Sequence, residues 1–205
     1  VNSISFGKLT MADAGFIYGP LREYVLYTGA RAVGGLTLAN VRVVHVVANV
    51  VGAVLVFAAA RRVAPRRAFV ALAVLALALL HTPLVAMMNY LQTYSFGWAD
   101  AARAGLPCFG AALALTAPAE EPRRGRFVFL GGLLVGTAVL YSHDFGFVAV
   151  ASTGGALLSG VLVRGAPLRA RARGTLRDAL AFGVGVGAVL GLFTLVYAVK
   201  GRAGL

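Results

Sequence analysis

Long apolar segments separated by arginine clusters constrain the fold of this chain more than any other feature of its sequence. A helix needs about 20 mostly apolar residues to cross a hydrocarbon core of about 30 Å. Residues 41–60 and 68–88 meet this requirement, and the whole chain has 60% hydrophobic but only 13% charged residues. A soluble domain carries about 25% charged residues. The sequence therefore predicts an integral membrane protein that is embedded in a lipid bilayer.

Four more apolar segments bring the predicted spans to about six. They cover residues 101–117, 127–140, 147–163 and 179–199. The predicted fold is all-α, a polytopic bundle of about six transmembrane helices formed by residues 41–199, with one additional interfacial amphipathic helix. Residues 1–40 are predicted to be a loop that carries this interfacial helix, and residues 200–205 a short end on the same side of the membrane.

Arginines fall in every second connection between the predicted spans. The clusters comprise Arg61, Arg62, Arg66, Arg67, Arg123, Arg124, Arg126, Arg164, Arg169, Arg171, Arg173 and Arg177. Residues 89–100 and 141–146 contain no Lys or Arg. By the positive-inside rule the arginine-rich connections are cytoplasmic. This topology accounts for most of the net charge of +12, so no nucleic-acid partner is predicted.

The same rule predicts a multi-pass protein with an extracytoplasmic N-terminal segment, and the expected location is the bacterial inner membrane. Residues 1–40 begin at Val1 without a signal peptide. We therefore expect at least one preceding transmembrane helix, which would make this chain a piece of a longer protein.

A helix is expected from Pro20, which suits the first helical position, to the Gly34-Gly35 pair, which favours termination. Its helical spacing predicts one apolar face, made of Leu21, Tyr24, Val25, Thr28 and Ala32. The helix is too polar for a transmembrane span, because it contains Arg22, Glu23 and Arg31. We interpret it as an amphipathic helix in the outer membrane interface; the alternative is a simple lead-in to the first span.

Two stretches of the sequence stand out as motifs. The first is Asp13-Ala-Gly-Phe-Ile-Tyr18-Gly-Pro-Leu21, followed by the amphipathic helix, by Gly34-Gly35 and by Arg42 at the entry of a span. The second is Tyr141-Ser-His-Asp-Phe-Gly146 between two helices. Together they resemble GT-C type membrane glycosyltransferases, the group of protein mannosyltransferases and lipid A aminoarabinose transferases. The first stretch is similar to the end of the first outer loop of that family, and at the second stretch relatives often carry a lysine.

The resemblance implies an enzyme that moves a sugar from a polyprenyl-phosphate donor to an extracytoplasmic acceptor. The acceptor is left open as a glycan, a lipid or a protein. An acidic residue of the first outer loop would be the base that takes the proton of the acceptor hydroxyl. Asp13 is the only Asp of that segment and is the candidate catalytic residue, although the acid of relatives often lies further upstream. The alternative for Asp13 is a solvated loop residue or a helix cap.

Cations on the outer side are the candidates for binding the lipid phosphate, because a charge in a membrane is costly and usually marks function. They are Arg103, His143 and Arg42, and Lys200 and Arg202 after the last span are further outer-side cations of this kind. The alternative for each is that the side chain extends to the interface. The candidate acceptor- or sugar-binding residues are Tyr18, Glu23, Trp98 and Asp144. No metal site is predicted, and a requirement for a divalent metal is left open.

The predicted span 127–140 has 14 residues and would be only about 21 Å long as a helix. The turn at 141–146 would then lie within the membrane, where irregular backbone indicates a cavity or binding site. A hairpin whose helices continue to the surface is the alternative.

Other functions remain open at this stage. A transporter or a non-catalytic membrane subunit is the first alternative, but no repeat is visible and the predicted spans contain no Asp or Glu. An O-antigen ligase or polymerase is the second, although such proteins need a large outer loop between later helices.

Overall fold

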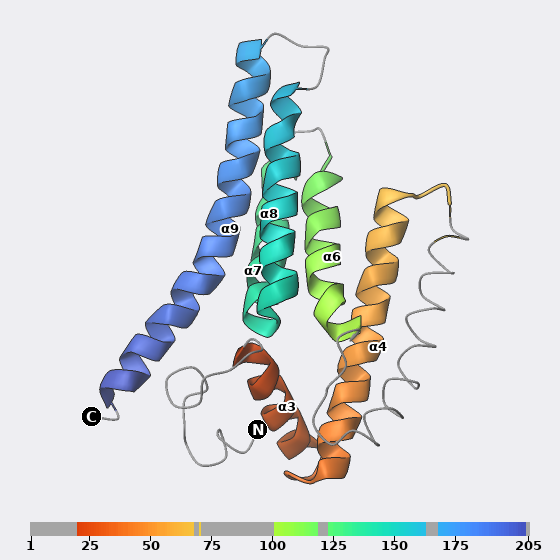
Figure 1. Cartoon of the computed structure of the whole chain (residues 1–205), viewed down its shortest axis with the longest axis vertical. Coiled ribbons are helices and arrows are strands. Elements are labelled where there is room, and N and C mark those ends of the chain that lie inside the picture. The colour runs from red at the N-terminus through yellow and green to blue at the C-terminus, as the bar shows by residue number, and fades with distance from the viewer. Residues whose placement is uncertain (1–19, 68–69, 71–100, 119–122, 163–167, 204–205) are drawn as a thin grey trace.

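The computed structural model describes residues 20–67, 70, 101–118, 123–162 and 168–203 (Figure 1). Every secondary-structure element in these residues is a helix. The elements are α3 (Pro20–Val33), α4 (Leu38–Val63), α6 (Ala101–Leu115), α7 (Arg123–Tyr141), α8 (His143–Ser159), the short 3₁₀ helix η1 (Gly160–Leu162) and α9 (Leu168–Ala203). The predicted span 68–88 and the predicted site residues Asp13, Tyr18 and Trp98 lie outside the described residues.

Four of these helices are long and apolar enough to cross a membrane. The apolar stretches are Leu38–Val63, Arg123–Tyr141, His143–Leu162 and Arg171–Lys200. Only 17% of the most apolar window of α9 is buried inside the molecule, which leaves a large apolar surface of the kind that contacts lipid. The predicted all-helical fold is thus confirmed, and four candidate membrane-spanning helices support the prediction of a membrane protein. The third predicted span forms the shorter helix α6 of 15 residues, and six spans remain a prediction.

The arginine-bearing helix ends gather at one end of the bundle. Figure 1 shows the C-terminal ends of α4, α6 and α8 directed toward the same end of the molecule as the N-terminal end of α9. The arginines belong largely to helix termini rather than to loops, for example Arg61 and Arg62 in the last turn of α4 and Arg123 in the first turn of α7. Helix α3, the first turn of α6 and the α7–α8 turn lie toward the opposite end (Figure 1).

Small residues let the helices approach closely. A Cβ added to Gly105 of α6 would lie 2.6 Å from the Cα of Gly52 in α4, and one added to Gly131 of α7 would lie 2.6 Å from the carbonyl oxygen of Gly110 in α6. Such contacts are typical of membrane helices, whose association depends on close packing. The buried cluster that joins α6 to α9 is correspondingly rich in Ala and Val.

Helix α7 corrects the prediction of a short fourth span. It begins at Arg123 and has 19 residues, so it is about 28 Å long and its first turn carries the arginines. The expected irregular turn at 141–146 is also wrong, because α8 begins at His143 and only Ser142 separates the two helices. Gly146 permits this tight hairpin, since a Cβ there would collide with the backbone of Val139.

The bounds of α3 agree with the sequence prediction. Gly34 and Gly35 adopt positive φ angles of 136° and 115°, and the Gly35 amide donates to the carbonyl oxygen of Ala30 at 3.0 Å, which ends the helix. The residues of α3 that are buried against the rest of the molecule are Pro20, Arg22, Leu26 and Ala30. The structure tests neither the predicted apolar face nor the interfacial placement of α3.

Candidate functional site

Three polar side chains meet where α6 begins and the α7–α8 hairpin turns. Arg103 Nε donates to Ser142 Oγ at 2.8 Å, and Arg103 Nη2 forms an ion pair with Asp144 Oδ2. Ser142 Oγ in turn donates to Asp144 Oδ1 at 2.6 Å. The Arg103 guanidinium also lies over the ring of Phe145, 4.9 Å from its centroid. We call Arg103, Ser142 and Asp144 the hairpin cluster.

The start of α6 positions Arg103. Asn49 of α4 accepts a hydrogen bond from the Ala102 amide through Oδ1 at 3.2 Å, which satisfies one of the free amides in the first turn of α6. His45 Nε2 lies 3.1 Å from Asn49 Nδ2 and thereby fixes the orientation of the Asn49 side-chain amide. Pro107, inside the same helix, has no amide to donate to the Arg103 carbonyl, so the first turn is free to depart from ideal geometry.

The hairpin supplies the other two members. Ser142 is the extended residue between the helices, with φ −154° and ψ 101°, and its hydroxyl is therefore turned toward α6. Asp144 lies in the first turn of α8, where the positive end of the helix dipole favours a carboxylate. The cluster thus depends on a contact between two elements about 40 residues apart in sequence.

Burial is unequal within the cluster. The Arg103 side chain is 1% exposed, whereas that of Asp144 is 52% exposed. A buried guanidinium thus holds an accessible carboxylate in a fixed orientation, because charge-assisted hydrogen bonds are strong and directional. The group that a ligand could reach is the carboxylate of Asp144.

The structure therefore brings together two of the predicted site residues, Arg103 and Asp144. His143 precedes Asp144 in the first turn of α8 and is partly buried, with its ring 6.3 Å from that of Phe147. Arg42 lies exposed near the start of α4, and Glu23 lies partly buried in the first turn of α3. Neither belongs to the hairpin cluster.

Sequence reasoning missed two residues at this end of the molecule. Ser142 was not among the predicted site residues, although a hydroxyl two residues before a carboxylate at a helix start often bonds to it locally. Arg22, which is 2% exposed, counted only as evidence against a span. Arg22, Leu26 and Ala30 follow one another at intervals of four residues, which places them on one face of the helix. This spacing was the sign in the sequence of a buried face.

A second ion pair lies at the arginine-rich end. Arg124 Nε lies 2.6 Å from Asp178 Oδ2, and Arg124 Nη1 donates to the Ala117 carbonyl beyond the end of α6. Arg171 likewise donates to the Val161 carbonyl in η1. Asp178 is only 6% exposed. This pair joins the first turn of α7 to the N-terminal part of α9 and presents no accessible carboxylate, which distinguishes it from the hairpin cluster.

In the described part of the chain, no group of three or more His, Cys, Asp or Glu side chains lies close enough to hold a metal ion. The described residues thus offer Asp144 as a single carboxylate rather than as part of a ligand set.

Comparison of the chain with family models, with curated proteins and with solved structures gave no match. The relationship to GT-C type glycosyltransferases therefore depends on the short sequence motifs described above.

Proposed function

We propose that the chain is part of a membrane glycosyltransferase that transfers a sugar from a polyprenyl-phosphate donor to an extracytoplasmic acceptor. The observation that carries the proposal is the accessible Asp144 carboxylate, held by the buried Arg103 at the end of the bundle opposite to the arginine-bearing helix ends. Under the positive-inside rule that end faces away from the cytoplasm, where lipid-linked sugars are consumed. The proposed location of the protein is a bacterial inner membrane.

The reaction requires a base and cations. The acceptor hydroxyl attacks the anomeric carbon, the bond from that carbon to the phosphate oxygen breaks, and polyprenyl phosphate leaves. A carboxylate takes the hydroxyl proton during the attack, and cations stabilise the phosphate that departs. In the proposal Asp13 is the base, and His143 and Arg42 approach the phosphate.

The hairpin cluster would orient the sugar or the acceptor. An ionised carboxylate accepts strong hydrogen bonds from sugar hydroxyls, and Asp144 is accessible enough to do so. Arg103 is buried beneath it, so we assign Arg103 to positioning the carboxylate rather than to contacting the phosphate directly.

Sugar transfer in membranes that contain the intact protein tests the proposal. The donors would be radiolabelled polyprenyl-phosphate-linked mannose and aminoarabinose. A hydrogen bond to a charged group contributes about 1.5–3 kcal/mol, so we expect Asp144→Asn to lower kcat/KM by roughly 10- to 150-fold. Asp13→Ala and His143→Ala should also lower the rate of transfer.

Asp178→Asn is the matched control. Asp178 also pairs with an arginine across two helices, but at the arginine-rich end, so its loss should cost stability and leave transfer by the folded protein intact. Equal rates for the unchanged protein and Asp144→Asn, at equal amounts of folded protein, would remove Asp144 from the site. No transfer from either donor by the unchanged protein would count against the proposed activity.

A further inference from the structure

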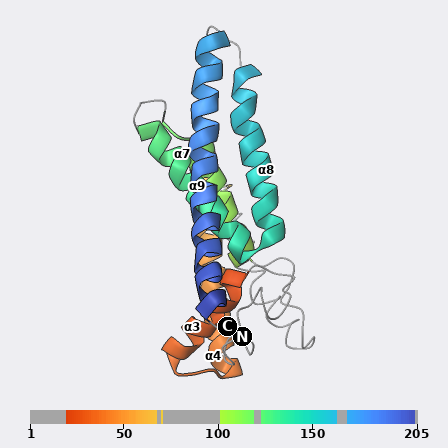
Figure 2. The ribbon, with the colours of Figure 1, turned by 90° about the vertical axis from the view of Figure 1, so that its left-hand side faces the viewer.

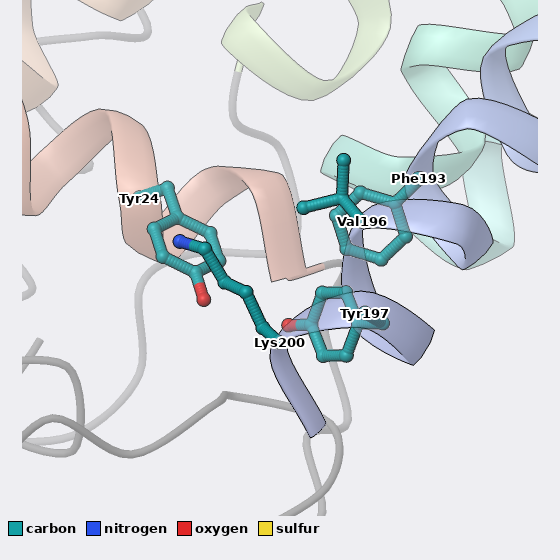
Figure 3. Close-up of a pocket in the computed structure, with 5 residues that line it drawn as sticks. All are labelled: Tyr24, Phe193, Val196, Tyr197 and Lys200. Carbon is teal, nitrogen blue, oxygen red and sulfur yellow. The ribbon is translucent and has the colours of Figure 1, made fainter. Parts of the chain in front are cut away.

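A pocket that shares no lining residue with the hairpin cluster lies between α3 and the C-terminal part of α9 (Figure 3). Its volume is about 230 Å³. The lining residues are Tyr24 of α3 and Phe193, Val196, Tyr197 and Lys200 of α9. The pocket thus combines aromatic walls with a single cation, and it joins parts of the chain that are far apart in sequence.

Helix α9 fixes one wall of this pocket. Phe193 and Tyr197 are one helical turn apart, and their ring centroids lie 4.5 Å from each other at an interplanar angle of 41°. Figure 3 shows Tyr24 facing them from α3, with the hydroxyl groups of Tyr24 and Tyr197 directed toward each other. Aromatic rings of this kind are apolar on their faces and polar at one tip, which suits the boundary between lipid and water.

Lys200 supplies the charge. It is the last residue of the apolar stretch of α9, and its side chain projects across the pocket toward Tyr24 (Figure 3). Within the described part of the chain Lys200 forms no hydrogen bond or ion pair, and the lining residues include no carboxylate. The positive charge is therefore available to an anion.

The surface of α9 beside the pocket is apolar. Leu192, Leu195 and Val199 are between 60% and 64% exposed, as expected for side chains in contact with acyl chains. A volume of about 230 Å³ is below the range of about 300–1,000 Å³ that encloses a drug-sized ligand. The pocket is therefore suited to a headgroup whose hydrocarbon tails lie outside it, along α9.

We propose that this pocket binds the anionic headgroup of a bilayer phospholipid, with Lys200 as the counter-ion of the phosphate and Tyr24 and Tyr197 as the walls. A lipid in this position would bridge α3 and α9. The proposal does not depend on glycosyl transfer, because none of the pocket residues belongs to the hairpin cluster.

Lipid retention by the purified protein tests this site. The protein would be reconstituted in nanodiscs of phosphatidylglycerol and phosphatidylcholine, and the lipids that remain bound after release into detergent would be counted by native mass spectrometry. We expect preferential retention of phosphatidylglycerol by the unchanged protein. Lys200→Gln should reduce this retention about fivefold, the factor for losing one lysine at an anionic surface, and Lys200→Arg should restore it.

Arg31→Gln is the matched control, because Arg31 contributes one positive charge to α3 but hydrogen-bonds to Tyr27 and does not line the pocket. Its retention of phosphatidylglycerol should be unchanged. Equal retention by Lys200→Gln and the unchanged protein would overturn the proposal, as would equal losses in both variants. Displacement of phosphatidylglycerol by millimolar inorganic phosphate would show a free-anion site, and selective displacement by polyprenyl phosphate a carrier-lipid site; either result would also overturn it.

Discussion

Arg103 is a charged residue in an apolar helix, and three neighbours make its burial tolerable. Ser142 and Asp144 accept its hydrogen bonds, and Phe145 covers the guanidinium face. Buried charges are stable only when they are paired and hydrogen-bonded. Asp144, by contrast, remains half exposed and can be hydrated without a partner. Arg103 therefore depends on Asp144 more than Asp144 depends on Arg103.

This asymmetry predicts different costs for removing each partner. Asp144→Ala takes away the carboxylate that neutralises a buried arginine, and we expect it to lower the free energy of unfolding by about 2–4 kcal/mol, somewhat below the value for a fully buried pair. Arg103→Met leaves only a hydrated carboxylate and should cost about 1–2 kcal/mol. Thermal unfolding in detergent compares the two variants. A larger loss for Arg103→Met would contradict the account of the pair.

At the scale of elements, close backbone contact decides how α4 and α6 pair. The first turn of α6 lies against Gly52, and a Cβ on this glycine would collide with the carbonyl group of Ala101. Gly183 of α9 is equally helical but has open space where a Cβ would stand. These two glycines therefore provide a matched pair for testing the packing.

We expect Gly52→Ala to lower the free energy of unfolding by about 1–3 kcal/mol or more, because backbone atoms cannot move aside as a flexible side chain can. Gly183→Ala should be neutral or slightly stabilising, since alanine has a higher helix propensity than glycine. The midpoint of thermal unfolding measures both effects. Equal midpoints for the two variants would refute the close α4–α6 contact.

The sequence predicted the helices far better than their ends and faces. Hydropathy located α4, α7, α8 and α9, because a bilayer imposes length and apolarity on every span. It failed at Arg123, where arginines that were assigned to a loop form the first turn of α7. It did not predict that Arg22 is buried, because this burial depends on tertiary packing. The Arg103–Asp144 contact could not be predicted either, because nothing in the sequence pattern sets the distance between α6 and the hairpin.

For the whole molecule, the separation of charge between the two ends is the main feature. The helix ends that bear most of the arginines are directed toward one end of the molecule, whereas α3 and the α7–α8 turn lie toward the other end (Figure 2 gives the second view). If the arginine-bearing end is cytoplasmic, exposed positions on α3 and at the end of α4 must lie on opposite sides of the membrane.

Cysteine labelling of intact cells tests this orientation. Cys108 is the single native cysteine and is exposed, so it would first be replaced by alanine. We expect an impermeant maleimide to label Thr28→Cys on α3 in intact cells. Arg66→Cys, after the end of α4, should react only once the cells are permeabilised. The reverse pattern would place the hairpin cluster in the cytoplasm and would remove the basis of the proposed activity.

The hydrogen bond from the Ala102 amide to Asn49 has a consequence for biogenesis. Helix α6 has 15 residues, about 22 Å, and is too short to cross a bilayer alone, and a first-turn amide without a partner is costly in hydrocarbon. Its acceptor lies 53 residues upstream and is synthesised first. Helix α6 should therefore enter the membrane in contact with α4. Because α4 is translated first, its Asn49 side chain is already in place when the shorter helix inserts.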